Sequence, residues 1–254
     1  MSSYLWPLAQ YKEVCDAVRA QTGKTGQLKM SELPAEIASI ASGSAAETWK
    51  ECWLEKPKAT PQTVFIDTGI AAAFDDEIEV TCRCSIGSMS ACFNAAGSSG
   101  TRMGMNFLPN NNRAQVFWGG YADTNITIDR AALDVTNTTV VTQNAAGVSI
   151  AGFNSNGVAA TWENTYTATG NAAPSQPYRL FVYDRNKDIH YGLFRKAIVR
   201  KDAGSVVYTI VPEVSNNFTA RLKITRRLIS DTETVSYVAV PAGFLCHVDN
   251  EAAV

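Results

Sequence analysis

The sequence predicts a mostly β fold, an antiparallel sandwich preceded by a short helical segment, and three observations support this. Short stretches alternate apolar and polar residues, most clearly FTARLKIT at 218–225, as is typical of strands with one buried face. Clusters of Gly, Asn, Asp and Ser, for example at 98–100 and 154–157, separate these stretches as turns. No long helical pattern lies between the strands, which favours antiparallel sheets over a parallel α/β arrangement.

Residues 8–21 predict an amphipathic helix, because Pro7 suits its first turn, apolar residues recur on one face and Gly23 ends it. After the loop TGKTGQ, Ser31 is the expected N-cap of a second short helix. Helices this short are unstable alone in water, so their apolar stripes must contact each other, a neighbouring subunit, another protein, or the β domain. We predict that residues 1–43 form a helical attachment or oligomerisation segment. Its expected contact residues are Leu8, Tyr11, Val14, Val18, Leu33, Ile37 and Ile40.

The boundary of the β domain follows from composition. ASGSAAE at 41–47 is a small-residue linker, and a Pro-punctuated stretch comes soon after it. We assign residues 44–63 to the linker and the first turn of the sandwich. VFIDTGI at 64–70 is the expected first strand of the domain, which we predict to span 64–254.

Composition and charge exclude several functions. A net charge of −2 argues against nucleic-acid binding, which needs concentrated Lys and Arg. The sequence has no run of about 18 apolar residues, so it predicts no membrane-spanning helix. The N-terminus MSSYLWPLAQYKE lacks the basic and apolar regions of a secretory signal. We therefore expect the protein to be made and kept in a cytoplasm until the cell opens, with no membrane insertion.

No metal or cofactor site is predicted. The six cysteines lack the paired spacing of a zinc site. Cys82 and Cys84 share the apolar face of the stretch EIEVTCRC, which indicates buried thiols and a fold independent of disulfides. The stretch 184–188 begins like a calcium loop, but Ile189 stands where that loop needs Gly and Arg195 where it needs Glu. A hairpin turn is the favoured interpretation there.

The search for catalytic residues predicts none. His190 and His247 are the two histidines, and no nucleophile elbow accompanies either. The acidic stretch at 75–79 offers Glu77 and Glu79 on one strand face for glycoside hydrolysis, and a solvated strand edge explains the same residues. The sequence therefore predicts a protein that is not an enzyme, with polysaccharide depolymerase kept as an alternative.

Aromatic residues beside polar turns suggest a binding surface. Trp118 and Tyr121 flank the turn at 119–120, and Trp162 and Tyr166 flank a polar loop. Aromatic rings stack on the C–H faces of sugars, and loops at a sandwich rim hold such shallow sites. We predict these four residues as ligand-binding, while packing in the sandwich core remains the alternative for each.

Three stretches of the chain resemble a known family. VFIDTGI at 64–70 and PYRLFVYDRNKDIHYGLFRKAIVRKDAGSVVYTIVP at 177–212 resemble the concanavalin-like (laminin-G-like) jelly-roll domains of bacteriophage and prophage tail proteins. DAVRAQTGKTGQLKMSELPAEIASI at 16–40 is similar to a helix–KTGK loop–helix segment of tail and baseplate proteins from phages of Gram-positive bacteria. Residues 220–254 show no counterpart to the family's closing strand pair.

The resemblance implies a virion protein associated with a phage tail, baseplate or fibre. Its jelly-roll would bind a receptor, a host-surface carbohydrate, and its partners would be other phage structural proteins and copies of itself in a homotrimer. Two alternatives remain: a purely structural capsid decoration or head-fibre protein without a ligand, and the depolymerase.

Overall fold

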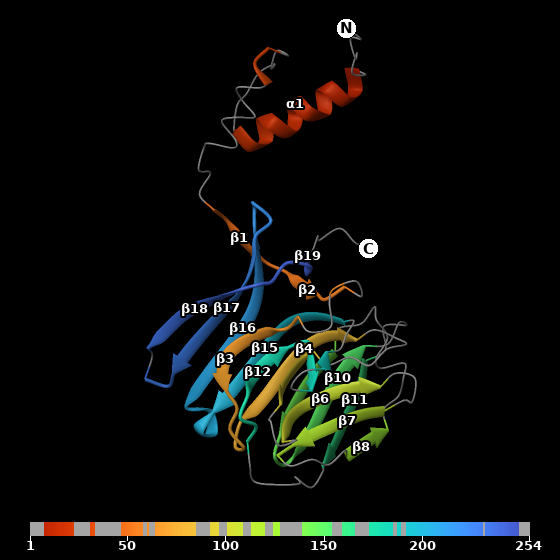
Figure 1. Ribbon diagram of the computed structural model, residues 1–254, viewed down its shortest axis with the longest axis vertical. Helices are drawn as coiled ribbons and strands as arrows, with labels where there is room; N and C mark the ends of the chain where they lie inside the picture. The colour runs from red at the N-terminus through yellow and green to blue at the C-terminus, as the bar shows by residue number, and fades with distance from the viewer. Residues whose placement is uncertain are drawn as a thin grey trace. The chain divides into compact units, whose positions relative to one another are not determined.

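The structure, a computed structural model, consists of two compact units, Met1–Thr48 and Trp49–Val254, each considered by itself (Figure 1). The chain is described at residues 8–22, 31–33, 47–57, 60, 64–84, 92–96, 101–108, 113–119, 124–127, 139–153, 159–165, 173–184, 187–188, 192–230 and 232–248.

The N-terminal unit contains α1 (Leu8–Thr22), which confirms the helix predicted from the apolar stripe and Gly23. Cys15 and Val18 are buried together with Leu33, and Val14 packs against them half-buried. The helix therefore covers part of its apolar face within its own unit. Of the other predicted contact residues, Leu8 and Tyr11 lie in α1 with side chains outside the described residues, and Ile37 and Ile40 lie outside them altogether.

The second unit is an antiparallel β-sandwich, as the strand periodicity predicts, and it is of the jelly-roll type that the resemblance implies. Its larger sheet has 11 strands in the described part of the chain, with the order β11-β10-β9-β4-β15-β16-β17-β18 and with β1, β2 and β19 added beside it. The strands of the main path are β11 Ala159–Thr165, β10 Gly147–Phe153, β9 Thr139–Asn144, β4 Glu77–Cys84, β15 Gly192–Lys201, β16 Val206–Ser215, β17 Ala220–Leu228 and β18 Glu233–Ala239.

The smaller sheet has six described strands in the order β3-β12-β5-β6-β7-β8. They are β3 Ile66–Ala71, β12 Pro177–Leu180, β5 Phe93–Ala96, β6 Arg102–Leu108, β7 Arg113–Trp118 and β8 Thr124–Thr127. A short hairpin of β13 (Val182–Asp184) and β14 (Lys187–Asp188) forms where the sequence favours a turn over a calcium loop. The 3-10 helix η3 (Asp202–Gly204) connects β15 to β16.

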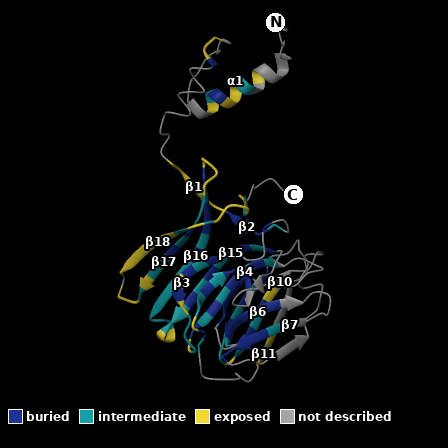
Figure 2. Cartoon of the chain, viewed as in Figure 1, coloured by how far each residue is buried: buried dark blue, intermediate teal, exposed yellow. Residues whose placement is uncertain are grey.

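The core lies between the two sheets, where buried residues gather (Figure 2). It is rich in aromatic side chains. Phe93 of the smaller sheet stacks on Tyr178 with 5.1 Å between ring centroids, and on Phe194 of the larger sheet at 6.3 Å. Tyr178 and Phe194 are 0% exposed. Stacked rings at this separation add to the burial energy, so this trio fixes how the sheets face each other.

Two short strands lie inside the stretch 44–63 that the sequence assigns to a linker. β1 (Trp49–Glu51) pairs with β16, and β2 (Trp53–Glu55) pairs with β15 and with the C-terminal strand β19 (Leu245–His247). The C-terminal part of the chain thus completes the larger sheet through β17, β18 and β19.

The described thiols are mostly buried, as the sequence predicts for Cys82. Cys15, Cys52, Cys82 and Cys92 are buried and Cys246 is half-buried, all without disulfides, whereas the side chain of Cys84 lies outside the described residues. None of the helices among the described residues has the length and apolar content that a membrane span requires. The same residues contain no group of three or more His, Cys, Asp or Glu side chains arranged to hold a metal ion.

Candidate functional site

A hollow with several polar side chains in its lining lies on the outer face of the larger sheet at β9, β10 and β11, and we call it the β9–β11 groove. Its volume is about 520 Å³, within the range of about 300–1,000 Å³ that small-molecule sites occupy. Its lining consists of Thr142, Asn144, Ala146, Gly147, Val148, Ser149, Glu163 and Thr165.

Strand alternation aims the polar side chains outward. In β9, Val141 and Gln143 are buried. Successive side chains of a strand point to opposite faces, so Thr142 and Asn144 face away from the core. In β10, the buried Val148 and Ile150 flank Ser149 in the same way. The core side of these strands therefore fixes the direction of the groove residues.

The strand register places the outward residues in two rows. Ser149 pairs with Thr142 on one side and with Glu163 on the other, which gives the row Thr142–Ser149–Glu163. Gly147 pairs with Asn144 and with Thr165, which gives the second row. Directly opposite residues in antiparallel sheets have Cβ atoms about 4.5–5.5 Å apart, so the first row is one continuous polar ridge. Gly147 has no side chain, and this leaves the second row hollow at its centre.

The groove offers hydrogen-bonding groups of three kinds. Thr142, Ser149 and Thr165 carry hydroxyl groups, which both donate and accept. Asn144 adds an amide whose Oδ1 accepts hydrogen bonds from the backbone N–H groups of Ala146 at 2.8 Å and Gly147 at 3.1 Å, so the β9–β10 turn fixes its orientation. Glu163, which is exposed, adds a carboxylate.

A second hollow of about 420 Å³ adjoins the groove and shares Asn144 and Ala146 with it. We call it the acidic hollow. The rest of its lining is Asp75, Asp76, Glu77, Ala145, Arg200, Ala203 and Gly204.

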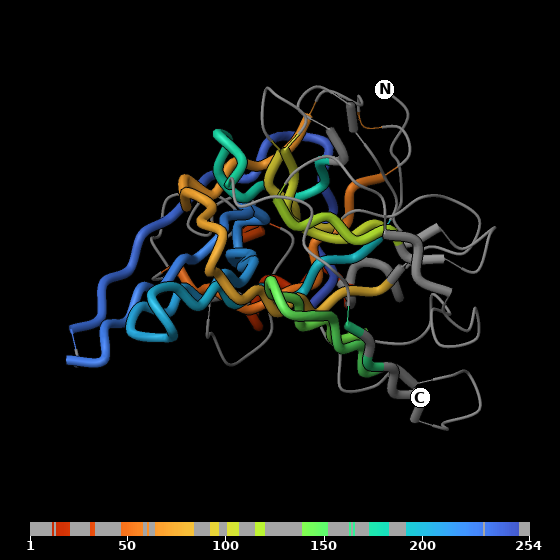
Figure 3. Tube along the Cα trace, turned by 90° about the horizontal axis from the view of Figure 1, so that it is seen from below, coloured from red at the N-terminus to blue at the C-terminus, as the bar shows by residue number. Residues whose placement is uncertain are grey.

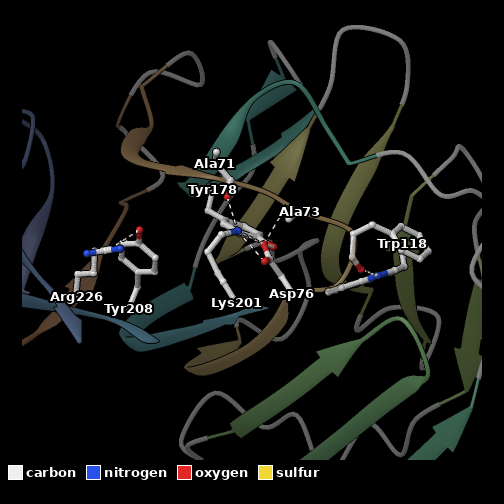
Figure 4. Close-up of polar contacts among 9 residues, drawn as sticks. Ala71, Ala73, Asp76, Trp118, Tyr178, Lys201, Tyr208 and Arg226 are labelled. Atoms are coloured by element: carbon white, nitrogen blue, oxygen red, sulfur yellow. Dashed lines mark hydrogen bonds and ion pairs between the residues drawn. The ribbon is translucent and has the colours of Figure 1, made fainter. Parts of the chain in front are cut away.

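Asp76, in the turn between β3 and β4, is the most enclosed carboxylate of the acidic hollow, at 0% exposed (Figure 4). It accepts hydrogen bonds from the Tyr178 hydroxyl at 2.9 Å, from the Ala73 N–H at 2.8 Å and from Lys201 Nζ at 2.6 and 2.8 Å. Burial, and then the neighbouring Asp76, raise the pKa of Tyr178 well above its ordinary 10.0. Since β12 and β15 both bond to this carboxylate, Asp76 joins the two sheets and its oxygens are already committed.

Glu77 and Glu79, the pair considered for glycoside hydrolysis, form an ion-pair network with Arg200. Its guanidinium donates to Glu77 at 2.6 Å and to Glu79 at 2.8 Å. The hydrogen bond to Glu79 is the largest cause of the raised pKa of Arg200. β4 pairs with β9 on one side and with β15 on the other, so Glu77 and Glu79 lie on a central strand. The sequence-based interpretation of this stretch as a solvated edge strand is therefore wrong.

The structure corrects the predicted aromatic site at Trp118. This side chain is 1% exposed, and its indole N–H donates to the carbonyl of Phe74 at 2.9 Å, so it belongs to the core and presents no face to a ligand. Trp162 lies in β11, paired with Ile150, with its side chain outside the described residues. Tyr121 and Tyr166 lie outside the described residues.

The structure describes one of the two histidines. His247 Nε2 lies 2.6 Å from a Glu55 carboxylate oxygen across the β2–β19 pair, and His190 lies outside the described residues. Sequence reasoning missed the β9–β11 groove, although the alternation in TVVTQN at 139–144 marks Thr142 and Asn144 as outward. What the sequence does not show is which strands bring Ser149 and Glu163 beside them.

Comparison with known proteins gives a likeness in structure alone. No family model matches the chain, and no curated protein matches it. Scytalido-glutamic peptidase, solved with a peptide-based transition-state analogue, is similar with a TM-score of 0.25 and 8% sequence identity, over 80% of this chain and 98% of the peptidase chain.

We withdraw the prediction that the chain is not an enzyme: the similar structure is itself an enzyme, and no observation establishes that this chain lacks an activity. A TM-score of 0.25 carries no functional argument, so the likeness assigns neither an activity nor a site to this chain.

Proposed function

We propose that this chain is a bacteriophage virion protein, associated with a tail, baseplate or fibre, whose β-sandwich binds a host-surface saccharide in the β9–β11 groove. The observation that carries the proposal is the pair of polar rows, Thr142–Ser149–Glu163 and Asn144–Gly147–Thr165, around a hollow of about 520 Å³.

The chemistry of the groove suits a ligand rich in hydroxyl groups. A sugar hydroxyl both donates and accepts, and so do the Thr142, Ser149 and Thr165 hydroxyl groups that would meet it. A hydrogen bond to the Glu163 carboxylate contributes about 1.5–3 kcal/mol, more than a neutral pair does.

The virion assignment rests on the resemblance of residues 16–40 and 177–212 to phage tail proteins. An open polar groove binds one saccharide weakly. Several copies on one particle raise the effective affinity, because later contacts become intramolecular. Weak single sites therefore suit attachment by an assembled particle.

The test is binding of the purified chain to a panel of bacterial surface polysaccharides, with Glu163→Gln and Glu47→Gln compared. Both substitutions remove one exposed carboxylate at nearly constant volume, but only Glu163 lies in the groove. Loss of a charge-assisted hydrogen bond should weaken binding about tenfold or more in Glu163→Gln, and Glu47→Gln should bind as wild type.

Three outcomes separate the possibilities. If the wild-type protein binds no polysaccharide, the saccharide-binding role is contradicted, and the remaining alternative is a structural decoration protein without a ligand. Equal binding by Glu163→Gln and wild type contradicts the site. Shortened polysaccharide chains after the same incubation would show a depolymerase, and the presence of the chain in purified phage particles tests the virion assignment separately.

A further inference from the structure

β18 (Glu233–Ala239) is an exposed strand at the end of the larger sheet. It is the last strand of the main path, next to β17, and β11 is the strand at the other end of that path. Every residue of β18 except the half-buried Val238 is exposed, and the β17–β18 hairpin reaches out past the rest of the sandwich (Figures 2 and 3). Val235 at 43% and Tyr237 at 53% are among the large apolar side chains left exposed.

The hydrogen bonds at the two ends of β18 show which of its backbone groups point to the open edge. The Thr232 carbonyl accepts from the Leu228 N–H at 3.2 Å, and the Val240 N–H donates to the Ala220 carbonyl at 3.2 Å. In an antiparallel ladder the residues alternate between the two sides, so even-numbered residues bond to β17. The N–H and C=O groups of Glu233, Val235, Tyr237 and Ala239 therefore point away from the sheet.

β18 lacks the features that keep edge strands from pairing. Natural edges carry Lys, Pro or a bulge, or are very short. The sequence ETVSYVA contains neither Lys nor Pro, and its register with β17 is regular over all seven residues. By contrast, β3 at the edge of the smaller sheet has a register irregularity against β12.

We propose that β18 pairs antiparallel with β18 of a second copy of this chain, about a two-fold axis at Ser236. In the fully overlapped register, Val235 lies opposite Tyr237 of the second copy, and Glu233 lies opposite Ala239. Both pairs join residues whose N–H and C=O groups point to the edge, so every outward group obtains a partner. The same register places the exposed side chain of Val235 against that of Tyr237, once on each side of the two-fold axis.

Charge favours the antiparallel orientation of the second copy. Glu233 is the one charged residue of β18. The antiparallel register sets each Glu233 against the uncharged Ala239 of the other copy, so the two Glu233 carboxylates stay apart. Arg221 of β17, which pairs with Ala239, keeps its own partner Glu213, to which it donates at 2.9 and 3.1 Å. A parallel pair in register would instead set Glu233 beside its own copy, where like charges repel.

Pairing at β18 makes one continuous sheet from two copies. Since β11 and β18 are the two ends of the main path, each copy keeps its β9–β11 groove at the far end of the joined sheet. The dimer would therefore present two grooves, which supplies the multivalency that weak saccharide sites need.

Amide hydrogen exchange on the full-length protein tests this pairing residue by residue. We expect the amides of Thr234, Ser236 and Val238 to be protected at every concentration. Those of Val235, Tyr237 and Ala239 should gain protection as the mass measured by light scattering rises from 27.4 kDa to twice that value. Outward amides that exchange fast at concentrations where the chain is dimeric would overturn the proposal, and so would a chain that stays monomeric.

Two matched variants locate the interface. Val235→Lys places a charge in the pairing edge, and Ile229→Lys makes the same change at an exposed residue beyond β17. The dimer's dissociation constant should rise about tenfold or more in Val235→Lys, because the two-fold axis doubles the effect, and stay within about twofold in Ile229→Lys. Unchanged assembly of Val235→Lys would place the contact elsewhere, such as at the N-terminal helical segment. Protection of the outward amides only after another protein is added would show a different occupant.

Discussion

Asp76→Asn should lower the unfolding free energy markedly, although Asn has nearly the same size and shape as Asp. Asp76 is 0% exposed and pairs with Lys201, whose side chain is 18% exposed. Removing one partner of a buried ion pair costs about 3–5 kcal/mol, because the remaining charge is left without compensation. Lys201 keeps its hydrogen bond to the Ala71 carbonyl at 2.9 Å and some contact with water, so we expect the lower end, about 3 kcal/mol.

Urea unfolding followed by tryptophan fluorescence measures this loss, with Glu79→Gln as the matched control. Glu79 also bonds to a cation, but its side chain is 26% exposed and that of Arg200 is 32% exposed, so the control should lose less than about 1 kcal/mol. A loss of 3 kcal/mol lowers the urea midpoint by about 1–3 M. If Asp76→Asn unfolds within about 1 kcal/mol of wild type, the carboxylate does not join the sheets as argued.

Three further predictions follow from burial and from the pKa shifts. Trp118→Ala should cost about 3–5 kcal/mol in the same assay, and a loss below about 1 kcal/mol would mean the indole is not in the core. Because the pKa of Tyr178 is raised in the folded state, its contribution to the unfolding free energy is complete below pH 10.0 and is lost as pH rises towards the folded-state pKa. Wild-type protein should therefore lose unfolding free energy between about pH 9 and pH 11, and Tyr178→Phe should lose less over the same range. The hydrogen bond between the two thiols lowers the pKa of Cys246 and raises that of the buried Cys52, so iodoacetamide should modify Cys246 first, and mass spectrometry that finds Cys52 modified first would contradict this.

The parts of the fold that repeat locally were predictable from the sequence. Apolar spacing and Gly23 are sufficient to identify α1, and two-residue alternation is sufficient to identify β4 and β17 as strands of a sandwich. In β17 the buried residues Leu222 and Ile224 follow the expected pattern. Phe218 breaks it, because it lies in the turn before the strand with φ of 60° and is 91% exposed.

Features that depend on strand register were not predictable. β1 and β2 have three residues each, too few to show alternation, and they become strands because β16, β15 and β19 pair with them. Trp118 follows a buried Phe117, and only the fold shows that both sides of β7 are covered. The β9–β11 groove likewise needs Glu163 beside Ser149, a neighbour 14 positions along the chain that pairing alone brings together.

The strictest test of saccharide binding in the β9–β11 groove is an NMR titration of the isotope-labelled protein with an oligosaccharide from the polysaccharide it binds. The largest amide shifts should fall at Thr142, Ser149, Glu163 and Thr165, with smaller ones at the β9–β10 turn that holds Asn144. Shifts that leave these residues unchanged and gather on another face of the sandwich would contradict the assignment of the groove.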